Sequence, residues 1–241
     1  MLKPLYFKTT QLIAWVLLFW VMVLALVYGG YQWQTDNACH QEYGFYQTNL
    51  SESIGGVVKE KSTITQAIAL SVSSNPIFKQ ALLNRHIPVR PTLIDYSNTL
   101  KTNTDYQSVW IQLIDAQGIS LARSWTEKQG DDLSKVRLDL ASLIEQPRHL
   151  NDISVGKFAL TFKSMVPLFN GQQQLMGVIE VITQVNSIDL QLQKELGVRS
   201  VVLVDSTYQS QLVHVPRDRF LDGYFVANKA ASTEDKAIIQ Q

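Results

Sequence analysis

The sequence has a single cysteine, Cys39, and its 21 basic side chains are matched by 21 acidic ones. One cysteine excludes an internal disulfide, and a formal net charge of zero gives no bulk electrostatic attraction to nucleic acid. No low-complexity segment and no long run of like charges is present. The composition therefore excludes a disulfide-stapled domain and argues against a nucleic-acid-binding protein.

Motifs that carry chemistry are also missing. The four histidines are scattered without a partner at metal-ligand spacing, and the chain has no glycine-rich phosphate loop and no Gly-x-Ser-x-Gly motif. No nucleophile has an obvious base as its companion. We therefore predict no catalytic residues, no metal and no cofactor, and we expect that the chain is not an enzyme.

A long hydrophobic run stands out against these absences. The stretch from Thr9 to Thr35 carries no charge, and within it Leu12–Tyr28 is apolar except for its closing tyrosine. A helix rises about 1.5 Å per residue, so about 20 apolar residues span the hydrocarbon core of a membrane. We expect a single membrane anchor over residues 12–31.

The flanks of this run predict its orientation. Lys3 and Lys8 precede it, and the first acidic residue is Asp36. Positively charged flanks stay in the cytoplasm, so residues 1–11 are predicted to be cytoplasmic and the bulk of the chain to lie outside. A cleaved signal peptide is the alternative, but the run exceeds the usual apolar region and no clear Ala-x-Ala site follows it.

Residues 40–104 are predicted to be helical, beginning with a long helix over 40–74. A mainly apolar stripe repeats every three or four residues, with Lys61 and Ser71 as its polar members. It consists of Leu50, Ile54, Val57, Lys61, Ile64, Ile68 and Ser71. Such a stripe is typical of a stalk that pairs in a homodimer, or of a helix packed on its own domain, and both can hold. Asn75-Pro76 predicts the start of a short helix, and residues 92–103 another.

Residues 105–197 change to a strand pattern. Val109–Asp115 and Ile119–Trp125 are predicted to form a hairpin, and Asn170-Gly171 joins two longer strands over Phe158–Phe169 and Leu175–Val185. Because the strands come in adjacent pairs, the fold class is α+β with an antiparallel sheet.

The remaining segments are shorter. Asp131-Asp132 are expected to cap a short helix that runs through Arg137, with a further helical turn or two over Leu138–Glu145. Asn186–Leu196 has a helical period and ends at Gly197. Val198–Asp205 is predicted to start a strand of a second module over 198–241, but Leu221–Gln241 shows no pattern that completes a second sheet.

The chain resembles the extracytoplasmic Cache sensor domains of bacterial membrane receptors, including double-Cache receptors. The resemblance rests on the order of anchor, long helix and PAS-like sheet, and on an ordered set of short segments. These segments are Ile114–Gly118, Arg123-Ser124-Trp125, Gly130–Ser134 with Arg137, Lys163–Leu168 and Gly177–Val181.

The resemblance implies a sensor that binds a small molecule, such as an organic acid, amino acid or amine, and signals through the bacterial inner membrane from the periplasm. It implies an output module for chemotaxis, a kinase or cyclic-dinucleotide chemistry. The chain ends at Gln241 without such a module or a second apolar span. We therefore expect a fragment of a longer receptor rather than a free-standing sensor subunit.

Eight side chains are candidates for the ligand site. Arg123 and Trp125, two apart on one strand, can grip a carboxylate and cover an apolar tail, or can simply be an edge arginine over a core tryptophan. Lys163 is a basic candidate or a solvent-facing lysine, and Glu180 is a buried partner of Lys163 or Arg123, or the exposed position of an alternating strand. Asp131, Asp132, Trp110 and Tyr106 complete the set; for these four, helix capping or core packing is the favoured role, and Arg137 is expected to pair with Asp131 or Asp132.

Two other function classes stay open. A membrane-anchored envelope scaffold would bind a protein partner and no small molecule through its PAS-like domain, with the stripe of the 40–74 helix as its interface. A sheet face filled with side chains would favour this class over a ligand sensor. A tethered hydrolase is the least favoured class because the motifs for it are missing.

Overall fold

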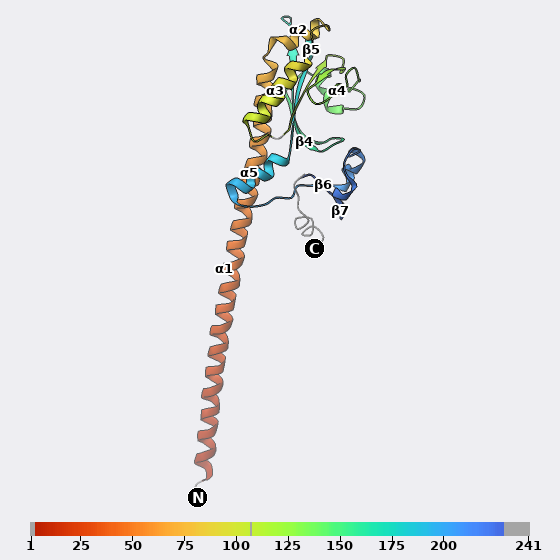
Figure 1. Cartoon of the computed structure of the whole chain (residues 1–241). Coiled ribbons are helices and arrows are strands. Elements are labelled where there is room, and N and C mark those ends of the chain that lie inside the picture. The colour runs from red at the N-terminus through yellow and green to blue at the C-terminus, as the bar shows by residue number, and fades with distance from the viewer. Residues whose placement is uncertain (1–2, 107, 229–241) are drawn as a thin grey trace. The chain divides into compact units, whose positions relative to one another are not determined.

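The computed structural model describes residues 3–106 and 108–228. Its backbone contacts divide the chain into two compact units, residues 1–54 and residues 55–241. A single helix, α1 (Lys3–Ser73), contributes to both units (Figure 1). The helix runs without a break through Gly55-Gly56, as the sequence predicts for a long helix that follows the anchor.

All described residues of the first unit belong to α1. Large apolar side chains from Leu12 to Trp33 are more than half exposed almost throughout, with Trp15 at 74% and Trp33 at 71%. Exposing such surface to water costs roughly 25 cal/mol per Å². Within the part of the chain that the structure describes, α1 is the one helix long and apolar enough to cross a membrane. The prediction of one candidate span is confirmed.

The second unit is built on a five-stranded antiparallel sheet with strand order β2-β1-β5-β4-β3. The strands are β1 (Val109–Asp115), β2 (Ser120–Arg123), β3 (Leu150–Val155), β4 (Leu160–Phe169) and β5 (Leu175–Gln184). The helices are α2 (Pro76–Leu83), α3 (Arg90–Asn103), α4 (Leu138–Glu145) and α5 (Asn186–Leu196). This arrangement confirms the α+β class and both predicted hairpins.

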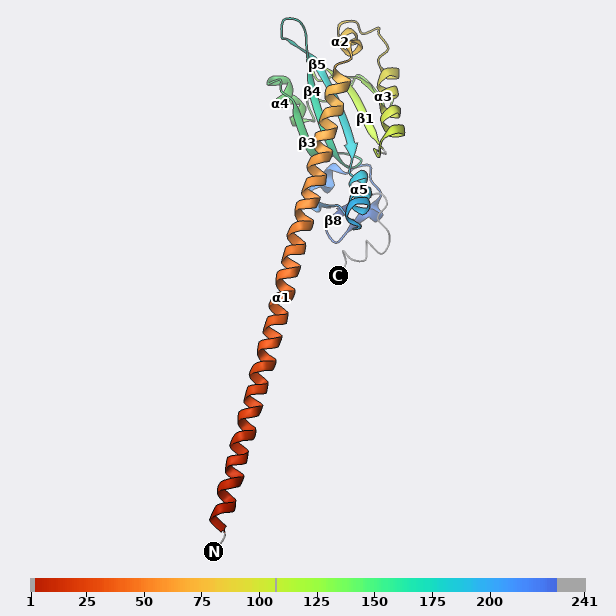
Figure 2. The same ribbon diagram turned by 90° about the vertical axis from the view of Figure 1, so that its left-hand side faces the viewer.

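The two faces of the sheet are covered by different elements (Figures 1 and 2). On one face, Ile111, Leu113 and Ile179 pack with Ala69 of α1 and with α2 and α3. On the other face, Ile114, Met165 and Val178 pack with Leu140 and Leu143 of α4. We call these the α1 face and the α4 face. Successive side chains of a strand point to opposite faces, so each strand contributes to both.

The stripe of α1 that faces the sheet differs in part from the predicted one. The buried positions are Val57, Lys61, Thr65, Ala69 and Val72. Ile64, which belongs to the predicted stripe, is 37% exposed. A straight helix with 3.6 residues per turn drifts away from a strict heptad, which explains the change of stripe. The helix packs on its own domain, one of the two predicted roles.

Local signals at helix ends behave as the sequence predicts. The Asn75 side chain accepts a hydrogen bond from the Ile77 backbone N–H at 3.0 Å and caps α2. Gly197 ends α5 with φ +67°, a left-handed conformation that glycine adopts without strain. Gly177 lies so close to the Ile114 carbonyl oxygen on β1 that a Cβ atom there would clash with it.

Three segments differ from the sequence prediction. Residues 131–137 form turns and no α-helix: Asp132 accepts hydrogen bonds from the backbone N–H and the hydroxyl of Ser134, but the helix begins only at Leu138. Leu150–Val155, to which the sequence analysis assigned no element, forms edge strand β3. Residues 203–226 contain a second sheet, which the pattern over Leu221–Gln241 failed to predict.

This second sheet has three antiparallel strands in the order β6-β8-β7. They are β6 (Leu203–Asp205), β7 (Phe220–Leu221) and β8 (Tyr224–Val226), joined through the 3₁₀ helices η1 (Ser206–Gln211) and η2 (Arg217–Arg219). Val204 and Phe225 share a core with Val57 of α1 and with Ile188 and Leu192 of α5. The second module is predicted over residues 198–241, and its last part, residues 229–241, lies outside the described residues.

Candidate functional site

Polar and charged side chains form a row across the α4 face of the five-stranded sheet. Strand register places Gln112 of β1 opposite Arg123 of β2 on one side and opposite Glu180 of β5 on the other. Glu180 is in turn opposite Met165 of β4. Residues opposite each other share a face, so the antiparallel pairing alone gathers this row. Glu180 is completely buried at its centre.

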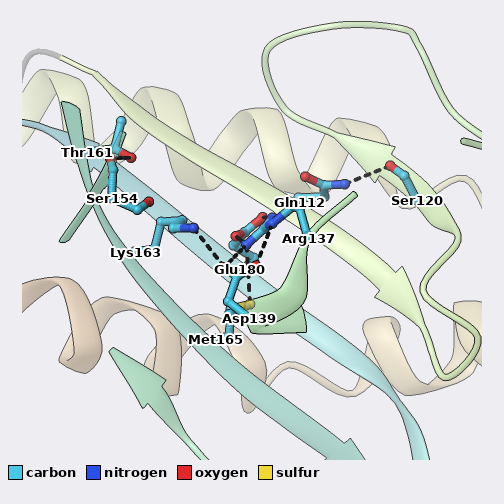
Figure 3. Close-up of polar contacts among 9 residues, drawn as sticks. All are labelled: Gln112, Ser120, Arg137, Asp139, Ser154, Thr161, Lys163, Met165 and Glu180. Carbon is cyan, nitrogen blue, oxygen red and sulfur yellow. Dashed lines mark hydrogen bonds and ion pairs between the residues drawn. The ribbon is translucent and has the colours of Figure 1, made fainter. Parts of the chain in front are cut away.

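Arg137 joins this row from the segment that precedes α4. Its Nη1 donates to Glu180 Oε2 at 2.9 Å, and its Nη2 donates to Asp139 Oδ2 at 2.7 Å (Figure 3). Glu180 Oε1 also lies 2.6 Å from Arg137 Nη2, an ion-pair contact without hydrogen-bond geometry. Lys163 of β4 donates to Asp139 Oδ2 at 2.7 Å. We call Arg137, Asp139, Lys163 and Glu180 the charged cluster.

Contacts within the charged cluster favour the charged forms of Arg137 and Asp139. Burial alone would lower the pKa of Arg137, but the carboxylates of Glu180 and Asp139 outweigh it and raise that pKa. Burial likewise favours neutral Asp139, yet hydrogen bonds from Arg137 and Lys163 lower the pKa of Asp139 well below its usual range. Arg137 and Asp139 therefore face each other as an ion pair at neutral pH.

A second ion pair lies on the β2 side of the same face. Arg123 is 6% exposed, and its Nη1 and Nη2 donate to the two carboxylate oxygens of Asp131 at 2.8 and 2.9 Å. The hydrogen bond from Arg123 is the largest cause that lowers the pKa of Asp131. Paired, fork-to-fork contacts of this kind fix the guanidinium plane.

Two tryptophans extend the face. Trp110 of β1 and Trp125, which follows β2, stack with ring centroids 5.2 Å apart. The Arg123 guanidinium carbon lies 6.0 Å from the centre of the Trp125 ring. Strand register places Trp110 opposite Ile182, and Ile182 opposite Lys163. The tryptophan pair thus forms an apolar wall beside the charged side chains.

The structure brings six of the eight predicted side chains onto the α4 face or its rim: Arg123, Trp125, Asp131, Lys163, Glu180 and Trp110. The other two lie elsewhere. Asp132 forms a turn with Ser134 and an ion pair with exposed Lys135. Tyr106 lies under the ammonium of Lys61 on the α1 side, with 4.0 Å between the nitrogen and the ring centre.

Two predicted pairings are wrong. Arg137 pairs with Asp139 and Glu180, not with Asp131 or Asp132, because the sheet register puts Glu180 within its reach. The partner of Glu180 is Arg137, not Lys163 or Arg123, whose own partners are Asp139 and Asp131. Sequence reasoning missed Asp139 and Gln112 as members of the site. The short Arg137-x-Asp139 spacing is the signal that could have indicated the first of them.

The site is electrically balanced within itself. Three cations (Arg123, Arg137 and Lys163) face three carboxylates (Asp131, Asp139 and Glu180). A ligand carboxylate can replace an internal carboxylate on Arg137 or Lys163, and a ligand ammonium can pair with the carboxylate so released. Among the described residues, no group of histidine, cysteine and acidic side chains could hold a metal ion.

Two cavities lined by described residues lie away from the charged cluster. An open groove of about 640 Å³ lies between residues 85–90 and β2, and its lining includes Arg85, His86 and Arg90. A smaller one of about 300 Å³ lies beside the Asn170 turn. The centre of the α4 face is filled instead by the paired side chains of the charged cluster.

Comparison with known proteins identifies the class. Residues 45–236 match the family model of the double sensory domain of two-component sensor kinases, dCache_3. The match covers more than half of the chain, and the chain belongs to this family. No curated protein matches the chain.

Several solved sensor domains are similar in fold at low identity. The sensor domain of Escherichia coli DcuS is 12% identical over 59% of this chain and 98% of its own, with a TM-score of 0.45. The sensor domain of the Vibrio cholerae histidine kinase DctB is 17% identical over 62% of this chain and 61% of its own (TM-score 0.48). The ligand-binding domain of the Campylobacter jejuni chemoreceptor Tlp3, solved with L-valine, is 13% identical over 70% and 72% (TM-score 0.48).

Proposed function

We propose that this chain is the ligand-sensing region of a bacterial transmembrane signal-transduction receptor, and that a small metabolite binds on the α4 face. The observation that supports this most is the gathering of six charged side chains on one face of a small sheet. Buried ion pairs are weak sources of stability, and apolar side chains would fill the same space as well. The presence of these charged side chains in a buried position therefore favours a role in binding.

The chemistry of the face suggests the ligand class. Arg137, Lys163 and Arg123 are suited to a carboxylate, and Glu180, Asp139 and Asp131 to an ammonium group. The Trp110–Trp125 pair would cover an apolar portion of the ligand. We therefore propose an organic acid, an amino acid or an amine as the bound metabolite.

The domain organisation follows the same proposal. Residues 1–11 are cytoplasmic, 12–31 anchor the chain in the inner membrane, and the rest lies in the periplasm. Residues 40–104 form the stalk and connector helices, 105–197 the sensor module, and 198–241 the start of a second module. A homodimer forms through the helix over residues 40–74, where Ile54 and Ile64 of the predicted stripe are 36% and 37% exposed.

A thermal-shift screen tests the function. The full chain in detergent is heated with panels of carboxylates, amino acids and amines, and hits are confirmed by calorimetry. We expect at least one hit that raises Tm, and loss of that shift in Arg137→Met, Lys163→Met and Arg123→Ala. Lys135→Met is the control, because Lys135 lies outside the charged cluster and its side chain is 80% exposed. The absence of any hit, or an unchanged shift in all three variants, would refute the proposal.

A membrane-anchored scaffold is the second candidate. It is favoured by the filled centre of the α4 face and by the open groove of about 640 Å³ beside β2, with its three basic side chains. In that case an acidic protein partner would occupy the groove, and Arg85→Ala with Arg90→Ala would abolish its binding while Arg137→Met would not.

A further inference from the structure

Five polar side chains interrupt the apolar contact between α1 and the α1 face of the sheet. They are Lys61 and Thr65 of α1, Tyr106 before β1, Thr183 of β5 and Ser187 of α5, and we call them the polar joint. Lys61 is 3% exposed, Thr65 1% and Thr183 0%. All five belong to the second unit of the chain.

The contacts of the polar joint connect α1 to two consecutive elements. The Lys61 ammonium donates a hydrogen bond to the Ser187 hydroxyl at the start of α5. The hydroxyls of Thr65 and Thr183 are 2.9 Å apart, which links α1 to β5. The ammonium also lies 4.0 Å from the centre of the Tyr106 ring, a cation–π contact.

Lys61 is a costly residue at this position. None of the ion pairs found within residues 3–106 and 108–228 includes it. Burying an ammonium without a carboxylate partner disfavours the folded state, and an apolar side chain would pack there at lower cost. A role other than stability explains the lysine better.

The chain segment 180–187 connects the polar joint to the charged cluster. Glu180 faces Arg137 on the α4 face, and Thr183, three residues later on β5, faces Thr65 on the α1 face. The odd spacing puts the two side chains on opposite faces of one strand. Ser187 follows in the first turn of α5. A displacement of β5 at Glu180 would therefore change two contacts with α1, the Thr65–Thr183 and Lys61–Ser187 hydrogen bonds.

We propose that Lys61 and Thr65 are positioning residues through which β5 and α5 couple the α4 face to α1, the helix that contains the membrane anchor. The inference rests on the proposed sensing function, which supplies the input at the charged cluster. Coupling of this kind is a free energy shared between two sites, so it can be measured without a ligand.

A double-mutant cycle on the full chain in nanodiscs tests this coupling. Arg137→Met perturbs the α4 face and Lys61→Met perturbs the polar joint. Urea unfolding is followed by tryptophan fluorescence, to which Trp110 and Trp125 of the second unit contribute. Independent sites without shared contacts add within about 0.5 kcal/mol. We expect non-additivity of about fivefold in the unfolding equilibrium constant, which is ~1 kcal/mol. Thr183→Val replaces Lys61→Met in a second cycle that leaves the lysine intact.

The matched control is Lys59→Met with Thr63→Val. These exposed residues repeat the chemistry of the polar joint, since Thr63 donates to the Lys59 carbonyl at 3.0 Å as Thr65 does to that of Lys61 at 2.8 Å. The control pair should be additive with Arg137→Met. Additivity in both test cycles would overturn the polar joint, even if the thermal-shift screen finds a ligand. Non-additivity together with a thermal-shift screen that finds no ligand would support the polar joint and refute the sensing function.

Discussion

At the level of single residues, Arg137 organises the α4 face. It contacts Glu180, Asp139 and the sulfur of Met165, which lies 3.6 Å from its Nη2. Lys163 gives Asp139 a second cation, whereas Glu180 depends on Arg137. Loss of Arg137 would therefore affect the completely buried carboxylate of Glu180 most strongly.

Removal of Arg137 should destabilise the second unit. Arg137→Met leaves Glu180 buried without its cation, a change that typically costs about 3–5 kcal/mol. The double variant Arg137→Met/Glu180→Met removes both charges and should recover most of that loss. Urea unfolding of the full chain measures both values. Equal destabilisation in the single and double variants would show that the pair is not the source of the cost.

The sequence identified most of the chemistry of the face but not its pairing. Glu180 could be selected because a charged side chain between apolar strand neighbours is unusual. Arg123 could be selected because it shares a strand face with Trp125, and Lys163 because of the family resemblance. Which cation meets which carboxylate depends on strand register across β1, β5 and β4, and the sequence gives no direct access to that. Asp139 was missed because it lies in α4, next to the sheet but outside any strand pattern.

At the level of elements, strong local signals made the prediction reliable. The Asn75 cap, the Asn170-Gly171 turn and the Gly197 stop are where the sequence places them. β3 was missed because Asn151 and Asp152 have low strand propensity and their strand is at the sheet edge. β6 lies within the strand predicted over Val198–Asp205, but β7 and β8 were missed because two- and three-residue strands carry no periodic pattern.

Strands β1 and β5 should not tolerate a side chain at residue 177. Gly177→Ala places a methyl group against the Ile114 carbonyl oxygen and against Leu82, so β5 must move away from β1. Overpacking of this kind costs about 1–3 kcal/mol. Gly171→Ala is the control, since no atom lies within 4 Å of a Cβ placed there. Thermal unfolding compares the two, and equal Tm values would contradict the close approach of the strands.

The free energy of unfolding of the second unit, which includes the contact of α1 with the sheet, should increase as pH rises from about 8 to 10. Burial lowers the pKa of Lys61 from 10.5 to about 8. The unfolded chain then holds more protons than the folded one in this window, so folding becomes more favourable with rising pH. The gain is on the order of 1–3 kcal/mol.

Lys61→Met should remove this pH dependence, and Lys59→Met should leave it. Burial and, to a smaller extent, Glu60 raise the pKa of Tyr106 to about 12. Its effect on the pH dependence of stability therefore has the opposite sign, and the stability that it contributes is lost only above about pH 10. Urea midpoints measured at pH 8, 9 and 10 separate the two groups. A wild-type midpoint that falls across this range, or matches that of Lys61→Met, would be inconsistent with a buried ammonium at Lys61.

At the level of the whole molecule, one chain combines an apolar helix with a sensory domain. The family match begins at residue 45, after the apolar run, and the family is a sensory one. The membrane span of this chain could be predicted from the sequence because such spans are recognised by length and composition alone.

The single cysteine provides a test of orientation. Cys39 is exposed on α1, after the predicted span, so a membrane-impermeant maleimide should label it in cells whose outer membrane is permeable. Cys39→Ser controls for background labelling. Labelling that requires lysis of the inner membrane would reverse the proposed topology.

Hydrogen–deuterium exchange of the full chain in nanodiscs tests the central claim most directly, with a hit from the thermal-shift screen at saturation. Bound ligand slows exchange where it restrains the backbone. We predict protection concentrated in peptides that contain Arg137–Asp139, Lys163 and Glu180. Protection confined to residues 85–90 and β2, with the charged cluster unchanged, would place binding in the basic groove and contradict a sensor site on the α4 face.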